Sequence, residues 1–314
     1  MTPIVTTGEP LGLLTPEKRG RIGLGTPMTF GIAGSECNVA IALARLGIPV
    51  WFGGAVGTDP AGNAVVHALL AEGVHVDLLT QNAHPTGLMM KEWFGLKPEP
   101  RVFYYREHTA MHDWEPPARL PPQLDGARLH VSGITLMIDE GLRERLLKWW
   151  RTSGHWGGAS LDLNIRWRLG DPDRWRQTLA DAMAHADLVF ASRSELLALW
   201  GSDASAALIA QGVLGDQQVL VVTDGDQGAW AELGGRLLAK VPAWPTSQVL
   251  DPVGAGDGFS AGVLAGRLKG LGWPESLTLG SVVGAFSVAH PGDWEGYPYW
   301  AEVREMIDGR WVER

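Results

Sequence analysis

Hydrophobic and polar positions along this chain follow two periods, which predict strands and helices in alternation. Short apolar runs typical of buried strands lie at 4–7, 50–55, 129–132, 159–163, 188–191 and 219–223, and a hairpin is predicted from 229–232 and 237–241. Apolar positions at helical spacing predict helices over 36–46, 60–72, 139–152, 172–184, 194–200, 257–270, 275–289 and 300–308. This alternation predicts an α/β fold with a doubly wound, mostly parallel sheet flanked by helices.

The alternation breaks in two places, and both predict a smaller sheet. Apolar runs at 86–94 and 101–106 surround Gly-Leu-Lys-Pro, which indicates a hairpin. Residues 9–33 are rich in Gly, Pro and Thr and lack helical periodicity. The prediction is an α/β domain formed by 1–8, 34–83 and 119–314, with 9–33 and 84–118 forming a β-sheet lid.

Composition limits the partners and the compartment. The 314 residues carry a formal net charge of −9, which argues against a nucleic acid or an anionic membrane as partner. The single cysteine, Cys37, excludes an internal disulfide and a cysteine metal cluster. No basic segment followed by an apolar run opens the chain, and no apolar stretch is long enough to span a membrane. We therefore expect a cytoplasmic protein with small-molecule partners.

One glycine-rich stretch, Asp251-Pro-Val-Gly-Ala-Gly-Asp257-Gly-Phe-Ser260, leads directly into a predicted helix. A helix N-terminus attracts anions through its free N–H groups and its partial positive charge. Asp257 in the first turn can act as a helix cap, or it can take a proton from an attacking hydroxyl while the turn holds a phosphate. The chain has no Gly-x4-Gly-Lys-Ser/Thr loop, so a P-loop lysine is not the phosphate-binding group.

Polar residues gather where predicted strands end, at 34–38, 162–166, 192–195, 223–228 and 251–257. Ligands of open α/β sheets bind beyond the carboxyl ends of the strands, so these clusters predict one site. Ser35 is expected to cap the helix over 36–46 with its hydroxyl.

Two of these stretches resemble the signatures of a known family. The turn at 251–259 resembles the C-terminal signature of the ribokinase-like (PfkB) carbohydrate kinases, and Gly34-Ser-Glu-Cys-Asn38-Val-Ala with Ala44-Arg-Leu-Gly47 resembles their N-terminal one. Within the family, the stretches 102–106, 162–166 and 292–296 are most similar to the 2-keto-3-deoxygluconate kinases. This resemblance implies a ribokinase-like fold and transfer of phosphate from ATP, with Mg²⁺, to a sugar-acid hydroxyl.

The resemblance also implies roles for individual residues. Asp257 would be the catalytic base, with Gly254, Ala255 and Gly256 stabilising the developing charge. The sugar pocket would contain Gly34, Asn38, Tyr104, Arg106, Ile134, Arg166 and Asp293. The nucleotide would contact Asn164, Arg166, Ser192, Thr223, Gly225, Gly228, Gly254 and Gly256. Glu195 would hold Mg²⁺ through water, and two copies would pair through the lid; a requirement for K⁺ is left open.

Three positions depart from the family pattern. Ala33-Gly34 replaces a pair of glycines, Met89 stands where sugar-acid kinases often carry a tyrosine, and Ser192 replaces the asparagine of an Asn-x-x-Glu motif. These departures concern the sugar and nucleotide pockets rather than Asp257.

Other interpretations of the same residues are kept open. Arg106 and Arg166 can be surface arginines in exposed ion pairs, Glu195 a first-turn helix acid, and Asp293 a turn residue. His108 and His112 beside Asp113 can suggest a metal site. For the function, the alternatives are another PfkB kinase acting on ribose, fructose or a different keto-sugar, and a sugar- or nucleotide-binding homologue that has lost catalysis.

Overall fold

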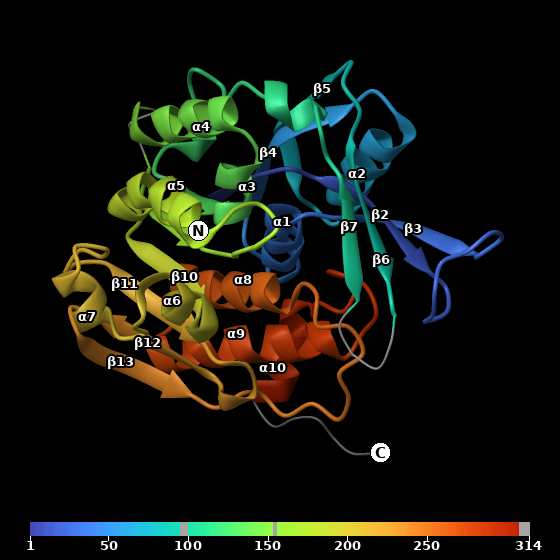
Figure 1. Cartoon of the computed structure of the whole chain (residues 1–314). Helices are drawn as coiled ribbons and strands as arrows, with labels where there is room; N and C mark the ends of the chain where they lie inside the picture. The colour runs from blue at the N-terminus through green and yellow to red at the C-terminus, as the bar shows by residue number, and fades with distance from the viewer. Residues whose placement is uncertain (95–99, 153–155, 308–314) are drawn as a thin grey trace.

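A large, mostly parallel sheet forms the centre of the structure (Figure 1). The computed structural model describes residues 1–94, 100–152 and 156–307. Within these residues the main sheet has nine strands in the order β13-β12-β11-β10-β9-β8-β1-β4-β5. They are β1 (Ile4–Thr7), β4 (Val50–Gly57), β5 (His75–Asn82), β8 (Arg128–Ser132), β9 (Ala159–Asp162), β10 (Leu188–Ser192), β11 (Val219–Thr223), β12 (Ala229–Leu233) and β13 (Arg236–Val241). All neighbours are parallel except β12, which is antiparallel to β11 and β13.

Helices cover both faces of this sheet, because successive strand residues point to opposite sides. Ile4 belongs to an apolar cluster with α1 (Ser35–Arg45), α2 (Pro60–Ala71), α8 (Ala255–Leu268), α9 (Trp273–Val288) and α10 (Trp300–Ile307). Val5 belongs to the cluster of the other face, with α3 (Gly133–Ile138), α4 (Glu140–Thr152), α5 (Pro172–His185), α6 (Arg193–Trp200) and α7 (Ser205–Ala210). Short 3-10 turns lie at Ala110–Asp113, Pro122–Leu124 and Gly225–Gln227. The predicted doubly wound α/β fold is confirmed.

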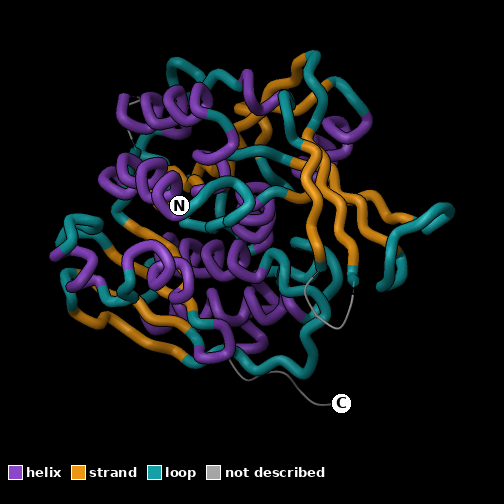
Figure 2. The backbone as a smooth tube through the Cα atoms, in the orientation of Figure 1, coloured by secondary structure: helices purple, strands orange, loops and turns teal. Residues whose placement is uncertain are grey.

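A second, four-stranded sheet stands beside the main one (Figure 2). Its order is β3-β2-β6-β7, with β2 (Leu11–Pro16), β3 (Met28–Ala33), β6 (Gly87–Glu92) and β7 (Arg101–Tyr105). Its strands fall within 9–33 and 84–118. The pairs β2–β3 and β6–β7 are antiparallel, and β2 and β6, which join the two segments, are parallel. The turn expected at 95–98 lies outside the described residues. We call these four strands the small sheet; the division into a main domain and a lid stays a prediction.

Three elements were not anticipated from the sequence pattern, namely β5, α3 and α7. The strand β5 is half exposed and contains polar residues such as His75 and Gln81, so it lacks the apolar run of a buried strand. The helices α3 and α7 have six residues each, which is too short to show a helical period.

The expected role of Ser35 as a helix cap is wrong. The capping position of α1 is occupied by Gly34, whose φ of 124° is in the region that favours glycine, and Ser35 is the first helical residue. The Ser35 hydroxyl is therefore free to point away from its own helix. None of the helices in the described ranges is long and apolar enough to cross a membrane.

Candidate active site

The N-terminus of α8 forms one wall of the candidate site. Gly254 caps this helix with a φ of 86°, and a Cβ at this position would overlap the carbonyl oxygen of Asp293. The hydroxyl of Tyr297 donates to the carbonyl oxygen of Gly254 at 2.6 Å, which fixes the turn from the other side. The first-turn N–H groups of a helix have no partner within it, so this end of α8 can bind an anion.

Asp257 lies in this first turn and is held by donors from two other segments. Ser35 Oγ donates to Asp257 Oδ1 at 2.7 Å, and Asn38 Nδ2 donates to Oδ2 at 2.8 Å, both from α1. Asn164, in the loop after β9, donates from Nδ2 to Oδ1 at 3.3 Å. Asn164 has a φ of 42°, a conformation that asparagine tolerates better than most residues.

The environment of Asp257 raises its pKa towards neutral pH. Burial raises the pKa of Asp257 to about 6, and the nearby Glu36 adds to the rise. The hydrogen bonds from Asn38 and Ser35 and the charge of Arg166 oppose it, because they stabilise the ionised carboxylate. A carboxylate with a pKa near 6 is ionised at neutral pH and basic enough to accept a proton.

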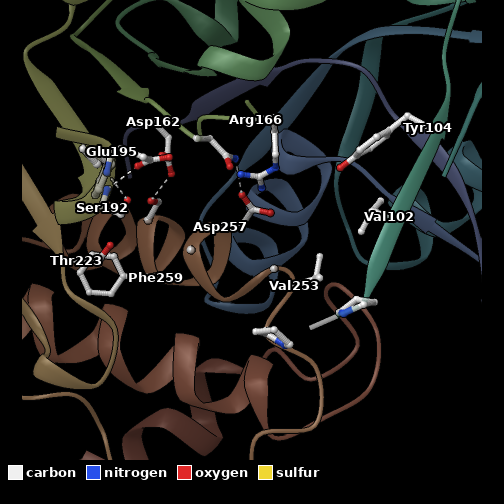
Figure 3. Close-up of a pocket in the computed structure, with 18 residues that line it drawn as sticks. Val102, Tyr104, Asp162, Arg166, Ser192, Glu195, Thr223, Val253, Asp257 and Phe259 are labelled. Carbon is white, nitrogen blue, oxygen red and sulfur yellow. Dashed lines mark hydrogen bonds between the residues drawn. The ribbon is translucent and has the colours of Figure 1, made fainter. Parts of the chain in front are cut away.

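Two cavities meet at Asp257, and Figure 3 shows the larger of the two. The smaller, of about 50 Å³, lies between α1, the small sheet and the turn before α8. The larger, of about 400 Å³, extends past the ends of β9, β10 and β11. Both share Tyr104, Arg166, Val253, Gly254 and Asp257. A third cavity, of about 630 Å³, shares Thr223, Gly256 and Phe259 with the 400 Å³ cavity, and the names small and larger are kept for the two cavities that meet at Asp257.

Arg106 lies inside the small cavity and not on the surface. Its Nε donates to Glu9 Oε2 at 2.6 Å, and Glu9 also accepts a hydrogen bond from the hydroxyl of Thr109. The guanidinium lies 5.5 Å from the ring centre of Tyr104. Because the side chain of Glu9 is almost fully buried, this pair is not the exposed ion pair of the alternative interpretation.

Comparison with known proteins explains this arrangement. Residues 7–299 match the model of the pfkB family carbohydrate kinases. This chain belongs to that family. It is 30% identical over 302 residues to the 2-dehydro-3-deoxygluconokinase of Bacillus subtilis, covering 94% of this chain and 92% of the relative. It is 32% identical over 309 residues to a fructokinase of Klebsiella pneumoniae, covering 96% and 97%.

A solved structure shares the fold of this kinase. The crystal structure of a sugar kinase from Pyrococcus horikoshii in complex with ATP superposes with a TM-score of 0.80 at 24% identity, covering 98% of this chain and 99% of that one. Membership of the family makes the chain a phosphotransferase whose acceptor is a sugar hydroxyl.

The structure brings the residues singled out in the sequence into these three cavities. The small cavity contains every residue expected to contact the sugar: Gly34, Asn38, Tyr104, Arg106, Ile134, Arg166 and Asp293. The larger one contains Asn164, Arg166, Ser192, Glu195, Thr223, Gly254 and Gly256, whereas Gly225, Gly228 and Ala255 line the third. The Asn164 amide also hydrogen-bonds Ser35 and Asp257. The roles assigned to these residues stay predictions.

Two carboxylates of the larger cavity fit a magnesium ion held mainly through water. Glu195 Oε1 accepts from the N–H of Ile165 at 2.6 Å and Oε2 from the N–H of Ser192 at 2.7 Å, so it also closes a capping box on α6. Asp162 Oδ2 accepts from Ser260 Oγ at 2.9 Å. Burial, with Glu195 and Asp257 nearby, raises the pKa of Asp162 well above its usual value, and a cation bound beside these carboxylates would oppose the rise. Such a pair of hard oxygen ligands suits Mg²⁺, which keeps several waters.

The histidine-based metal interpretation is not supported. No group of three or more His, Cys, Asp or Glu residues in the described segments could hold a metal ion. His112 Nδ1 lies 3.1 Å from the hydroxyl of Thr109, and Asp113 pairs with His84 at 2.9 Å. The ring centres of His108 and His112 are 6.2 Å apart.

Several residues of the site were missed by the sequence analysis. Glu9 follows β1, so the rule that ligands bind at the carboxyl ends of strands could have found it. Asp162 and Glu36 lie in the predicted clusters 162–166 and 34–38 but were given no role of their own. Glu36 accepts from the backbone N–H of Ser132 at 2.9 Å and from the Thr135 hydroxyl at 2.7 Å. Burial raises the pKa of Glu36. Lys91 carried no signal beyond its alternation with Met89 along β6.

Proposed function

We propose that this kinase phosphorylates the terminal hydroxyl of 2-keto-3-deoxygluconate with ATP. The observation that carries the proposal is the presence of two guanidinium groups, Arg106 and Arg166, in the cavity beside Asp257. A planar guanidinium binds a carboxylate through paired, charge-assisted hydrogen bonds. A neutral sugar has no charged group that could pair with these two cations.

The geometry supports a simple sequence of events. The acceptor hydroxyl lies in the small cavity, and Asp257 takes its proton as the oxygen attacks the γ-phosphorus. The bond from that phosphorus to the bridging oxygen breaks, and ADP leaves. The first turn of α8 stabilises the negative charge of the transferring group. The third cavity, with Trp244, Val249 and Val288, offers an apolar surface for the adenine ring.

Magnesium has a place in this proposal. Asp162 and Glu195 would hold the ion through water in the larger cavity. When bound, Mg²⁺ neutralises phosphate charge during transfer. A requirement for K⁺ stays open.

A substrate panel tests the choice of acceptor. We expect kcat/KM for 2-keto-3-deoxygluconate to exceed that for fructose or ribose by about tenfold or more, because hydrogen bonds to a charged group contribute about 1.5–3 kcal/mol. The joint change Arg106→Gln and Glu9→Gln removes the cation without leaving its buried partner unpaired. This variant should lose most of the preference. Equal rates on neutral sugars by the wild type would contradict the sugar-acid proposal.

Fructose is the second candidate, and one observation favours it. Glu9 already balances the charge of Arg106, and Met89 adds an apolar wall to the same cavity. A fructokinase is also among the relatives. The inactive-homologue alternative is less well supported, since Asp257 and the turn before it are both intact.

The pH profile provides an independent prediction for the base. We expect kcat/KM to rise with pH through about 6, because a general base acts only when ionised. Asn38→Ala removes a donor that stabilises the carboxylate, so the acid limb of both kcat and kcat/KM should move to higher pH. Asn63→Ala, on α2 and away from the site, is the matched control. A limb that stays in place or moves to lower pH would contradict the assignment.

We also propose that the kinase acts in the cytoplasm. A further proposal is that two copies associate through the small sheet. Phe30, Phe94 and Tyr105 expose 46%, 40% and 59% of their surface on or beside this sheet. Exposed aromatic residues gathered on one sheet are typical of an association surface.

A further inference from the structure

Lys91 is a fully buried lysine on the small sheet, far in sequence from the turn that precedes α8. Its Nζ donates to Asp251 Oδ2 at 2.7 Å and pairs with Asp293 Oδ1. The two carboxylate side chains are buried as well. One ammonium therefore joins three segments: β6, the start of the glycine-rich turn, and the loop after α9.

Both aspartates contact the glycine-rich turn, Asp251 through its carboxylate and Asp293 through its backbone. Asp251 Oδ1 accepts from the N–H of Val253 at 3.1 Å, which shapes the turn from within. The backbone of Asp293 lies directly against Gly254, where its carbonyl oxygen occupies the space of a missing Cβ. Lys91 is thus connected to residues 251–254 in two ways: directly through Asp251, and through Asp293, whose backbone lies against Gly254.

The same strand also forms part of the sugar pocket. Side chains alternate along β6, so Met89 and Lys91 share its buried face. Met89 lines the small cavity, as does Asp293. The ammonium therefore links the wall of the acceptor pocket to the helix end that faces the phosphate.

The charges of the cluster are mutually dependent. Burial lowers the pKa of Lys91, but Asp293 and Asp251 outweigh it and the net effect is a rise, so the amine stays charged. Burial raises the pKa of Asp293 to about 6, and Lys91 opposes this rise. Removing one member leaves a buried charge without its partner, which is costly.

We propose that Lys91 is a positioning residue for phosphoryl transfer, which holds the turn 251–254 in register with the acceptor pocket on β6. It touches neither reacting group. Its effect is to fix the distance between the acceptor hydroxyl, bound beside Met89, and the phosphate at the end of α8. The proposal requires only that the chain is a sugar kinase, and it holds whichever sugar is the acceptor.

The test compares Lys91→Met with Lys91→Arg, using the acceptor that the wild type phosphorylates best. We expect Lys91→Met to lower kcat by about tenfold to a hundredfold, because a small misplacement of reacting groups has effects of this size. KM for ATP should change much less than kcat, since the third cavity, proposed for the adenine ring, contains no residue of the turn 251–254. Lys91→Arg keeps the charge and should recover part of kcat.

Stability is separated from positioning by further variants. All assays are run well below each variant's thermal midpoint, measured by calorimetry. The double variant Lys91→Met/Asp251→Asn leaves one buried carboxylate unpaired instead of two, so it should be more stable than Lys91→Met, and its kcat should remain low. Arg128→Met is the matched control. It breaks the ion pair with Asp187 at the amino end of β8, away from the site, and should leave kcat unchanged.

Two results would overturn the proposal. One is a folded Lys91→Met or double variant with the kcat of the wild type. The other is a loss of kcat that parallels the unfolded fraction and is equalled by Arg128→Met, since that pattern indicates a contribution to stability alone.

Discussion

Replacement of Asp257 by asparagine is expected to lower kcat by about a thousandfold, the usual range for loss of a general base being 10²–10⁴. The amide has nearly the same shape as the carboxylate but cannot accept the proton of the acceptor hydroxyl. The fold should persist, because burying a neutral amide removes the desolvation cost that raises the pKa of Asp257. A coupled assay of ADP release measures kcat, and thermal unfolding checks the fold.

Binding measurements make this result specific. Asp257→Asn should bind ATP with an affinity close to that of the wild type, because the nucleotide cavity keeps its other contacts. Asp171→Asn is the matched control, since Asp171 also lies at a helix N-terminus, caps α5 and is exposed. ATP-dependent phosphorylation at an unchanged rate in Asp257→Asn would exclude the proposed mechanism.

Gly254→Ala should produce the second large effect, on both stability and kcat. An alanine at a φ of 86° is strained by about 1 kcal/mol or more, and its Cβ would overlap the backbone of Asp293. The turn must shift to make room, which moves the first N–H groups of α8 away from the phosphate. We expect kcat to fall by about a hundredfold or more, as for loss of other oxyanion donors. Thermal unfolding should show a lower midpoint.

The other end of the same helix provides the control for this change. Gly270 has a φ of 80°, but a Cβ there would meet no atom within 4 Å. Gly270→Ala should therefore cost only the backbone strain and leave kcat unchanged. Equal kinetic effects of the two substitutions would mean that the contact between Gly254 and Asp293 does not position the turn.

The parts of the fold that sequence could predict are those in which a local pattern decides the structure. The strand at 219–223 is a continuous apolar run because it is covered on both faces, and the structure has β11 over the same residues. Pro60 and Pro172 stand in the first turns of their helices, where proline has no hydrogen bond to lose. The edge strand β5 has no such pattern, since only part of it is buried.

The site divides in the same way. Asp257 and its glycines could be predicted because the short stretch 251–260 contains both the glycine-rich turn and the first turn of the helix. The partners of Arg106 and Asp293 could not, since Glu9 is 97 positions from Arg106 and Lys91 is a lysine within an otherwise apolar face. Ser35 matched the pattern of a helix cap, but Gly34 occupies that position, so the hydroxyl contacts Asp257 instead. Contacts of this kind depend on tertiary packing, which no local period encodes.

The three donors around Asp257 also bear on how the kinase returns to its starting state. After transfer the carboxyl group carries the proton of the sugar hydroxyl, yet Ser35, Asn38 and Asn164 all offer hydrogens to its oxygens. These hydrogen bonds stabilise the ionised carboxylate more than the protonated acid, so they favour release of the proton to water. With a pKa of about 6, about nine-tenths of the molecules are ionised again at pH 7. The side chains that orient the base for one turnover thus also favour its ionised form for the next, with water as the proton acceptor.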